Sequence, residues 1–169
     1  MAITRSRRRI GAARLRTLAG ALLDASTLCA IATVSPNGRP HVNTAYFAWS
    51  EFDVVWISEP HAAHSRNLRS NRSVAIAVYD SGQRWGRRDR GIQLFGSARE
   101  ADGDAERIYA ARFPEYRELD LGAYRFYRFR PQRMKLFDES ALGRGVFVTA
   151  RVSAGNLAWA RTEVYDSAD

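Results

Sequence analysis

The first pattern along the chain is a helical repeat of apolar positions. Leu15, Leu18, Ala19, Leu22 and Leu23 recur at intervals of three and four residues, which places their side chains on one face of an α-helix. The spacing predicts an amphipathic helix over about residues 12–25. Its apolar face would cover one end of a sheet or barrel.

After this helix the pattern changes to short β-type segments. LCAIATV (28–34) is an apolar run, and RPHVNTAYFAW (39–49) alternates between its two faces. Asn37 and Gly38 between them favour a tight hairpin turn, because both residue types accept positive φ. Three further segments have β character: DVVWIS (53–58), SVAIAVYD (73–80) and GIQLFGSARE (91–100). A fourth region predicts two strands, 124–130 and 134–137, separated by Pro131. Gly96 predicts a bulge or a close backbone approach.

Two more helices interrupt these strands. Pro60 suits the first turn of a helix that reaches to about residue 70. The acids of DGDAERIYAARF (102–113) suit the start of another, with Ile108, Ala111 and Phe113 on its buried side. Strands joined by tight turns predict a mostly β protein, a six-stranded antiparallel barrel with peripheral helices. The lack of a βαβ alternation and of a GxGxxG or P-loop signature excludes a doubly wound nucleotide-binding fold.

Composition and charge set the limits of the domain. A chain of 169 residues fits a single core. Much of the net charge of +8 comes from arginines within the first 16 residues, where no acid occurs. We therefore predict a flexible basic arm over 1–14, a barrel domain over 15–149 and a C-terminal extension over 150–169, of which 166–169 fray. Nucleic-acid binding is not expected, because the arm lacks a folded element that could read bases.

The single cysteine, Cys29, lies in an apolar run. Neither an intramolecular disulfide nor a Cys-rich metal site is therefore expected, and a reducing, cytoplasmic environment is the natural compartment. No apolar stretch approaches the ~18 residues that a membrane span needs, so no membrane insertion is expected.

The segment EPHAAHSRNLRSN (59–71) carries the densest chemistry in the chain. His61 and His64 could share one helix face, but a metal site needs further ligands that the sequence does not supply, so we predict no metal. The start of a helix offers unpaired N–H groups and a partial positive charge. The hydroxyl of Ser65 with the guanidinium of Arg66 or Arg69 would add charge-assisted hydrogen bonds to an anion such as phosphate. From the residues alone, a solvated basic helix is the alternative.

A second candidate is the loop QRWGRRDR (83–90), in which arginines surround Trp85. An indole among cations can stack on a flavin or a base while the cations meet phosphate. The loop would then be a lid over a cofactor or a site for an anionic substrate, and the alternative is an exposed, mobile loop. Serine-hydrolase chemistry is not predicted, because no GxSxG turn is present.

The order and spacing of four segments resemble the pyridoxamine 5′-phosphate oxidase-like family of flavin-binding split barrels, over about residues 15–148. The segments are LCAIATVSPNGRPHVNTAYFAW, VVWISEPHAAHSRNLRSNRSVAIAV, RGIQLFGSARE and FRPQRMKLFD. Within the family, the chain looks most like a subgroup of small bacterial proteins without a settled substrate. The resemblance implies a six-stranded antiparallel split barrel that binds FMN at the interface of a homodimer.

The resemblance also implies which residues bind the cofactor. Ser65 and Arg66 would hold the FMN phosphate, the strand ending at Ser58 and the backbone of the preceding strand would line the cofactor, and Gln93 matches a glutamine that reaches the flavin. With the candidates added from the patterns above, the set is Asn43, Thr44, Ala45, Ile57, Ser58, Ser65, Arg66, Arg69, Trp85 and Gln93. No catalytic side chain is assigned, because a flavin carries the redox chemistry itself.

The chain departs from the family in its basic residues. Family members often carry further basic residues on the second strand and a lysine after the serine–arginine pair, whereas Asn67 follows Arg66 here. The alternatives are that Arg69 or an arginine of the 84–90 loop meets the phosphate, or that the site takes a deazaflavin or haem. We expect an FMN-dependent oxidoreductase acting on a small molecule, with a non-catalytic flavin, deazaflavin or haem binding or sensing module as the alternative. Oxidation of vitamin B6 is not predicted, because the residues that bind the substrate phosphate have no convincing match.

Overall fold

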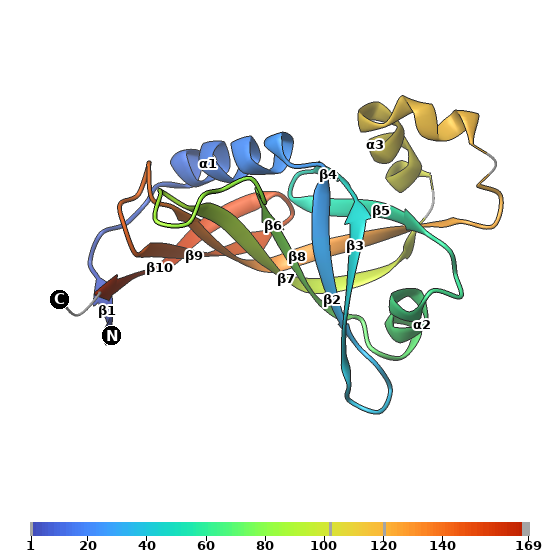
Figure 1. The fold of residues 1–169 in the computed structure, drawn as a ribbon, viewed down its shortest axis with the longest axis horizontal. Coiled ribbons are helices and arrows are strands. Elements are labelled where there is room, and N and C mark those ends of the chain that lie inside the picture. The colour runs from blue at the N-terminus through green and yellow to red at the C-terminus, as the bar shows by residue number, and fades with distance from the viewer. Residues whose placement is uncertain (1, 102, 120, 167–169) are drawn as a thin grey trace.

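In the computed structural model, which describes residues 2–101, 103–119 and 121–166, ten strands form one antiparallel sheet (Figure 1). Along hydrogen-bonded neighbours the order is β1-β10-β9-β8-β7-β6-β2-β3, and β5 pairs with both β4 and β8. The strands are β1 (Ala2–Ser6), β2 (Leu28–Val34), β3 (Pro40–Tyr46), β4 (Ala48–Ser50), β5 (Asp53–Ser58), β6 (Ser73–Tyr79), β7 (Arg90–Ala101), β8 (Arg125–Asp138), β9 (Val146–Ser153) and β10 (Asn156–Asp166).

Helices lie around the outside of this sheet. The predicted first helix is confirmed as α1 (Ala12–Ala25), which packs on β6, β7 and β10. α2 (Ala63–Ser70), α3 (Asp104–Arg112) and the short 3₁₀ helix η1 (Pro114–Glu118) follow later in the chain, and Figure 1 shows α2 and α3 at the end of the molecule away from the termini. Pro60 precedes α2 instead of entering its first turn, because a turn closed by Ala62 N–H donating to the Glu59 carbonyl at 3.1 Å comes first.

The predicted fold class is confirmed, since the chain is mostly β and antiparallel with peripheral helices. The predicted strand regions are all present, as β2, β3, β5, β6, β7 and β8. The sheet holds more strands than the six predicted, because β1, β4, β9 and β10 extend it. It also does not close: β3 and β5 do not pair within the described residues, and this opening splits the barrel.

β8 runs without a break through Pro131, where the sequence predicted two separate strands. Pro131 lies opposite Gly96 of β7, at a register shift between Phe95 and Gly96. A proline cannot donate a ladder hydrogen bond, and a bulge accommodates that loss. A Cβ on Gly96 would clash with the carbonyl oxygen of Arg130 and would lie 2.8 Å from the Cα of Pro131. The bulge and the close backbone approach predicted at Gly96 are both confirmed.

The first residues belong to the sheet, whereas the sequence predicted a flexible arm. β1 pairs with β10 in antiparallel register along its whole length. The guanidinium groups of Arg8 and Arg14 donate to the carbonyl oxygens of Leu142 and Ala141, each at 2.7 Å. The difference arises because β10 offers an open edge and because the basic side chains reach backbone acceptors far along the chain.

The residues beyond 150 complete β9 and form β10. Val152 and Leu157 of this hairpin are buried in the main core, together with Trp56, Phe129 and Met134. The segment thus contributes to the same core as the central strands. Fraying was predicted for 166–169. Asp166 instead ends β10, paired with Ala2, and 167–169 lie outside the described residues.

A second, smaller apolar cluster lies under α3. The fully buried residues of this helix are Ala105, Tyr109 and Ala110. Of the predicted buried residues, Ile108 and Phe113 are partly buried against the same cluster, whereas Ala111 is exposed. The helix is turned so that the Tyr109 ring meets the Phe126 ring of β8, with the centroids 5.9 Å apart. Packing of this large ring decides which face is buried.

Candidate functional site

A groove of about 640 Å³ opens at the end of the molecule where α2 and α3 lie. One wall consists of strand residues from β3 and the end of β5: Asn43, Thr44, Ala45, Tyr46, Ile57 and Ser58. The other wall comes from α3, η1 and the residues that follow: Tyr109, Phe113, Tyr116, Leu119, Leu121 and Tyr124. The start of α2 contributes Ala62 and His64. The groove is therefore assembled from segments that are far apart in the sequence.

β3 gives the groove a free strand edge. Within the described residues β3 pairs with β2 alone, so the peptide groups along its other edge have no strand partner. Side chains of neighbouring residues such as Thr44 and Ala45 point to opposite faces of the strand. An unpaired edge offers N–H donors and C=O acceptors to a polar, planar ligand.

The opposite wall is aromatic. The ring of the buried Tyr109 packs edge-to-face on Tyr116, with the centroids 5.7 Å apart, and Tyr46 of β3 meets Phe113 at 6.0 Å. Burial, and to a smaller extent the nearby Tyr46, raise the pKa of Tyr109 above its ordinary value. Its hydroxyl therefore stays protonated at neutral pH. The rings supply flat apolar surfaces that suit a planar ligand.

His64 is a buried polar residue on the wall of the groove. Its side chain is 4% exposed, and its Nε2 has no hydrogen-bond partner within the described residues. Burial, and then the neighbouring His41, lower the pKa of His64 below its ordinary value. The imidazole is therefore neutral at physiological pH. A neutral ring with an unpartnered nitrogen can donate to, accept from or ligate a bound molecule.

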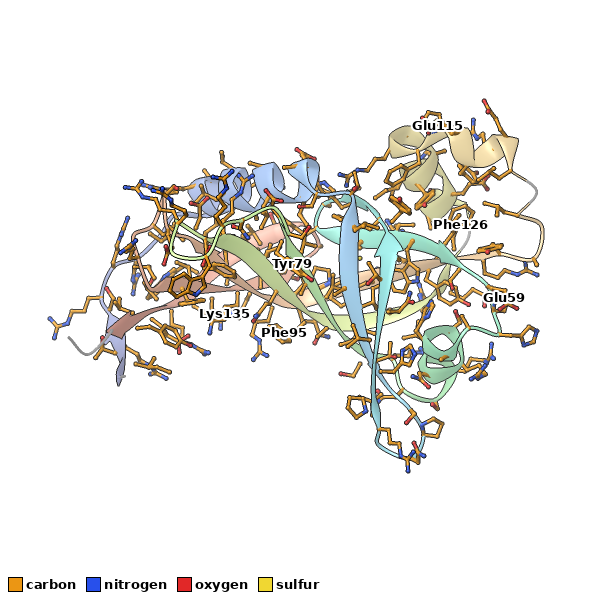
Figure 2. All side chains as sticks on the ribbon, in the orientation of Figure 1. Glu59, Tyr79, Phe95, Glu115, Phe126 and Lys135 are labelled. Carbon is orange, nitrogen blue, oxygen red and sulfur yellow. The ribbon has the colours of Figure 1, made fainter. Side chains whose placement is uncertain are left out.

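The charged side chains that line the groove are carboxylates. Glu59 and Glu115 are the charged residues on its described walls, and no arginine or lysine joins them there. Figure 2 shows both glutamates at the end of the molecule that carries Phe126. The groove itself therefore favours neutral or cationic groups over anionic ones.

The arginines of α2 lie beside the groove and bind the preceding loop. Arg66 is exposed, and its guanidinium donates to the carbonyl of His61. Arg69 donates to the carbonyl of Pro60 at 3.1 Å. The peptide N–H of Arg66 donates to the carbonyl of Ala62 at 3.0 Å, which places this arginine one helical turn from the groove wall.

The structure brings half of the predicted cofactor-binding residues together. Asn43, Thr44, Ala45, Ile57 and Ser58 share the groove. The others lie elsewhere. Ser65 and Arg69 line a separate cavity, and Arg66 lies beside the groove. Trp85 is fully exposed, and Gln93 lies on the outer face of β7. Figure 1 shows the loop between β6 and β7, which carries Trp85, near α1 and away from α2 and α3.

The aromatic wall was not predicted from the sequence, where His64 was considered only as a metal ligand. Tyr109, Phe113 and Tyr116 recur at intervals of four and three residues in YAARFPEY (109–116). That spacing was a usable signal for one aromatic face. It does not reveal that β3 lies opposite, because this pairing depends on the tertiary fold.

The groove fits the ring of a flavin better than it fits the phosphate. The free edge of β3, the unpartnered Nε2 of His64 and the aromatic wall suit a flat ring with a polar rim. A phosphate needs a cation, and no arginine or lysine lines the described groove wall; Arg66 and Arg69 of α2 lie beside it.

The open sheet, with a groove between its free edge and an added helical wall, defines a split-barrel protein. A family model described as pyridoxamine 5′-phosphate oxidase matches residues 17–138. The chain belongs to this family, and the family assignment made from the sequence is confirmed. No curated protein matches the sequence.

Solved structures with the same fold have diverse descriptions. The haem storage protein HutZ from Vibrio cholerae is 20% identical, with a TM-score of 0.59 over 69% of this chain and 89% of that chain. A putative pyridoxamine 5′-phosphate oxidase from Listeria innocua is 16% identical, with a TM-score of 0.61 over 73% of this chain and 98% of that chain. A haem-binding protein from Mycobacterium smegmatis is 15% identical, with a TM-score of 0.62 over 93% of this chain and 89% of that chain. At these identities the likeness shows the fold alone.

Two further observations concern the described residues only. None of their helices is both long and apolar enough to cross a membrane. Their His, Cys, Asp and Glu side chains form no group of three or more that could hold a metal ion.

Proposed function

We propose that this chain binds a flavin, in the first place FMN, in the groove and acts as an oxidoreductase on a small molecule. The observation that carries the proposal is that Asn43, Thr44, Ala45, Ile57 and Ser58, candidates from the resemblance, converge on one groove. The groove volume of about 640 Å³ lies in the range of small-molecule sites. Its walls combine a strand edge with aromatic rings, as a planar heterocycle requires.

A bound flavin supplies the two-electron redox chemistry. The residues of the chain bind and orient it. Peptide groups on the edge of β3 would hydrogen-bond the polar rim of the ring, while Tyr109 and Phe113 would pack against its flat body. Arg66 would meet the phosphate after exchanging its bond to the His61 carbonyl for a charge-assisted one.

We further propose that two copies of the chain pack through the outer face of the sheet. Cross-strand neighbours on this face form a row: Thr44, Ala30, Ala77, Gln93 and Lys135. Alanines keep the middle of the row flat. Thr44 lines the groove, and Gln93 lies three strands away, about 14 Å at ordinary strand spacing. A second copy on this face would cover Gln93 and could bring its own Gln93 toward the groove of the first.

The same face is apolar beyond this row. Val42, Tyr46 and Tyr79 on it are 64%, 59% and 54% exposed, respectively. Figure 2 shows Tyr79, Phe95 and Lys135 on the part of the molecule away from Glu59 and Glu115. Exposed apolar surface of this kind commonly marks an interface between proteins.

The test is an absorption spectrum of the purified protein followed by titration with FMN. We expect saturable binding that Arg66→Ala weakens at least ten-fold, because the variant removes a cation beside the groove. Arg39→Ala, at an exposed turn far along the chain, is the matched control. Equal affinities in the two variants would contradict the role of Arg66, and absence of any flavin binding would contradict the proposal itself.

A second candidate is a module that binds haem, or a deazaflavin, without turnover. The observation that favours haem is the unpartnered Nε2 of His64 on the groove wall, since a neutral imidazole is a common haem ligand. Titration with haem should then give a Soret band that His64→Gln shifts or abolishes. An identical band in wild type and variant would exclude His64 as the ligand.

A further inference from the structure

A second cavity, of about 410 Å³, lies between α2, β7 and β8. It shares no lining residue with the groove. Its walls carry Arg69, Arg72 and Arg99, the side chain of Glu100, and Leu68. This composition is the opposite of that of the groove, where the charged residues are acids.

Two of these arginines are fixed beside each other by the fold. Arg72 precedes β6, and its carbonyl accepts the N–H of Ala98 at 2.9 Å, so the backbone of Arg72 is bonded directly to the residue before Arg99. Within the described residues neither the Arg72 nor the Arg99 guanidinium has an ion-pair or hydrogen-bond partner. Both side chains are exposed, and a bound anion would give each guanidinium a charge-assisted partner.

Two buried hydroxyls belong to the same cavity. Ser65 is 1% exposed and Tyr127 is 2% exposed, both line the cavity, and neither hydroxyl has a hydrogen-bond partner in the described residues. The Tyr127 ring is held by stacking on Trp56, with the centroids 5.7 Å apart. Buried hydroxyls without partners are costly, and a bound acceptor would satisfy them.

The acid of the cavity already has a partner. Glu100 forms an ion pair with Arg125, with the Oε1 and Nε atoms 3.7 Å apart. Two neighbouring cavities share these arginines. Arg72 and Arg99 both line one of them, and Arg99 also lines the other. The balance of charge at the cavity is therefore positive.

We infer that this cavity binds a phosphate group, either free or carried by a small phosphorylated molecule. Arg72 and Arg99 supply the charge, and the hydroxyls of Ser65 and Tyr127 supply neutral donors. Donors from several directions match the tetrahedral oxygens of phosphate better than the two oxygens of a carboxylate. Leu68 and the Tyr127 ring leave an apolar surface for the organic part of an ester. The inference does not depend on flavin binding in the groove.

The test is a calorimetric titration with inorganic phosphate and with phenyl phosphate, at constant ionic strength set by sodium chloride. We expect saturable binding that Arg99→Ala and Arg72→Ala each weaken at least ten-fold, and that Tyr127→Phe, which keeps the ring, weakens several-fold. Arg39→Ala should bind as wild type does. Tighter binding of the ester would identify a phosphorylated molecule as the ligand, and equal binding would identify free phosphate.

The inference is wrong if phosphate gives no heat beyond that of chloride, or if Arg99→Ala and Arg39→Ala bind it equally. Circular dichroism of each variant establishes that it is folded. Flavin fluorescence separates the two proposals, because Arg99→Ala should leave the flavin titration unchanged and Arg66→Ala should leave phosphate binding at the cavity unchanged.

Discussion

His64 shows how the properties of one residue follow from its position. It lies on α2 with its imidazole buried, lines the groove, and has His41 as a titratable neighbour. Asn67, on the same helix, is bonded to Thr33 at 3.0 Å and so is not free to pair with the imidazole. A buried group of this kind resists protonation, and the stability of the protein therefore depends on pH.

The sign of that dependence follows from the lowered pKa. Unfolded His64 protonates near 6.5, while folded His64 protonates only at lower pH. Below about pH 6.5 the unfolded state binds more protons, so the free energy of unfolding falls as the pH falls through the folded pKa. We expect His64→Gln to flatten this slope below about pH 6.5, measured by urea unfolding.

The control for this experiment is His61→Gln, which removes an exposed imidazole from the same segment. Its slope should match that of wild type. Identical slopes in the two variants would show that His64 does not cause the loss of stability in acid.

The stability of the protein also depends on the absence of a side chain at Gly96. A methyl group there would meet the backbone of Arg130 and Pro131. We expect Gly96→Ala to lower the free energy of unfolding by about 1–3 kcal/mol, because backbone cannot move aside as a side chain can. Gly11→Ala, where a Cβ would meet nothing within 4 Å, should cost less than about 1 kcal/mol. Urea unfolding measures both, and equal losses would contradict the steric explanation.

Among the elements, α3 is tied to the end of α1 by one side chain, in addition to its aromatic packing on the sheet. Arg112, at the end of α3, donates through Nη2 to the carbonyls of Leu23, Asp24 and Ser26 at 3.1, 3.1 and 2.6 Å. Its guanidinium also lies 4.9 Å from the Phe47 ring centroid. The carbonyls at the end of α1 are thereby satisfied by a residue of α3. The aromatic wall of the groove is tied to the body of the protein through this contact.

Removing the contact should loosen that wall. We expect Arg112→Ala to lower the free energy of unfolding by about 1.5–3 kcal/mol and to increase hydrogen exchange over residues 104–118 more than elsewhere. Arg107→Ala, on the same helix but in an exposed ion pair with Asp104, is the control and should change both quantities little. If Arg112→Ala increased hydrogen exchange equally along the whole chain, a local role of Arg112 would be contradicted.

Elements that depend on local pattern could be predicted from the sequence, and those that depend on distant partners could not. α1, the turn at Gly38 and the bulge at Gly96 follow from spacing and backbone freedom. β1 forms because β10 offers an edge, and α3 turns because Tyr109 meets Phe126. In the site, the strand wall was predicted through family resemblance, whereas the aromatic wall and the cavity of Arg72 and Arg99 exist only once the chain is folded.

At the scale of the whole molecule, the proposed dimer places its interface on the outer face of the sheet. Ala77 lies in the flat middle of that face, paired with Ala30 and Gln93. We expect Ala77→Arg to convert a dimer to a monomer in sedimentation velocity, because a charge would be buried without a partner. Ala13→Arg, on the exposed side of α1, should leave the dimer intact. A dimer that survives Ala77→Arg would place the interface elsewhere.

The pairing of β1 with β10 has a topological consequence for engineering. Ala2 lies opposite Asp166 in register, and Cα atoms so paired are only about 5 Å apart. A linker of a few glycines and serines could therefore join the ends into a circle, and the circle could be reopened at the hairpin turn around Gly38. Such a permuted chain would keep its strand pairings while moving its termini from the end of the molecule farthest from the groove to the side of α2 (Figure 1). A fluorescent reporter fused there would report on ligand binding directly.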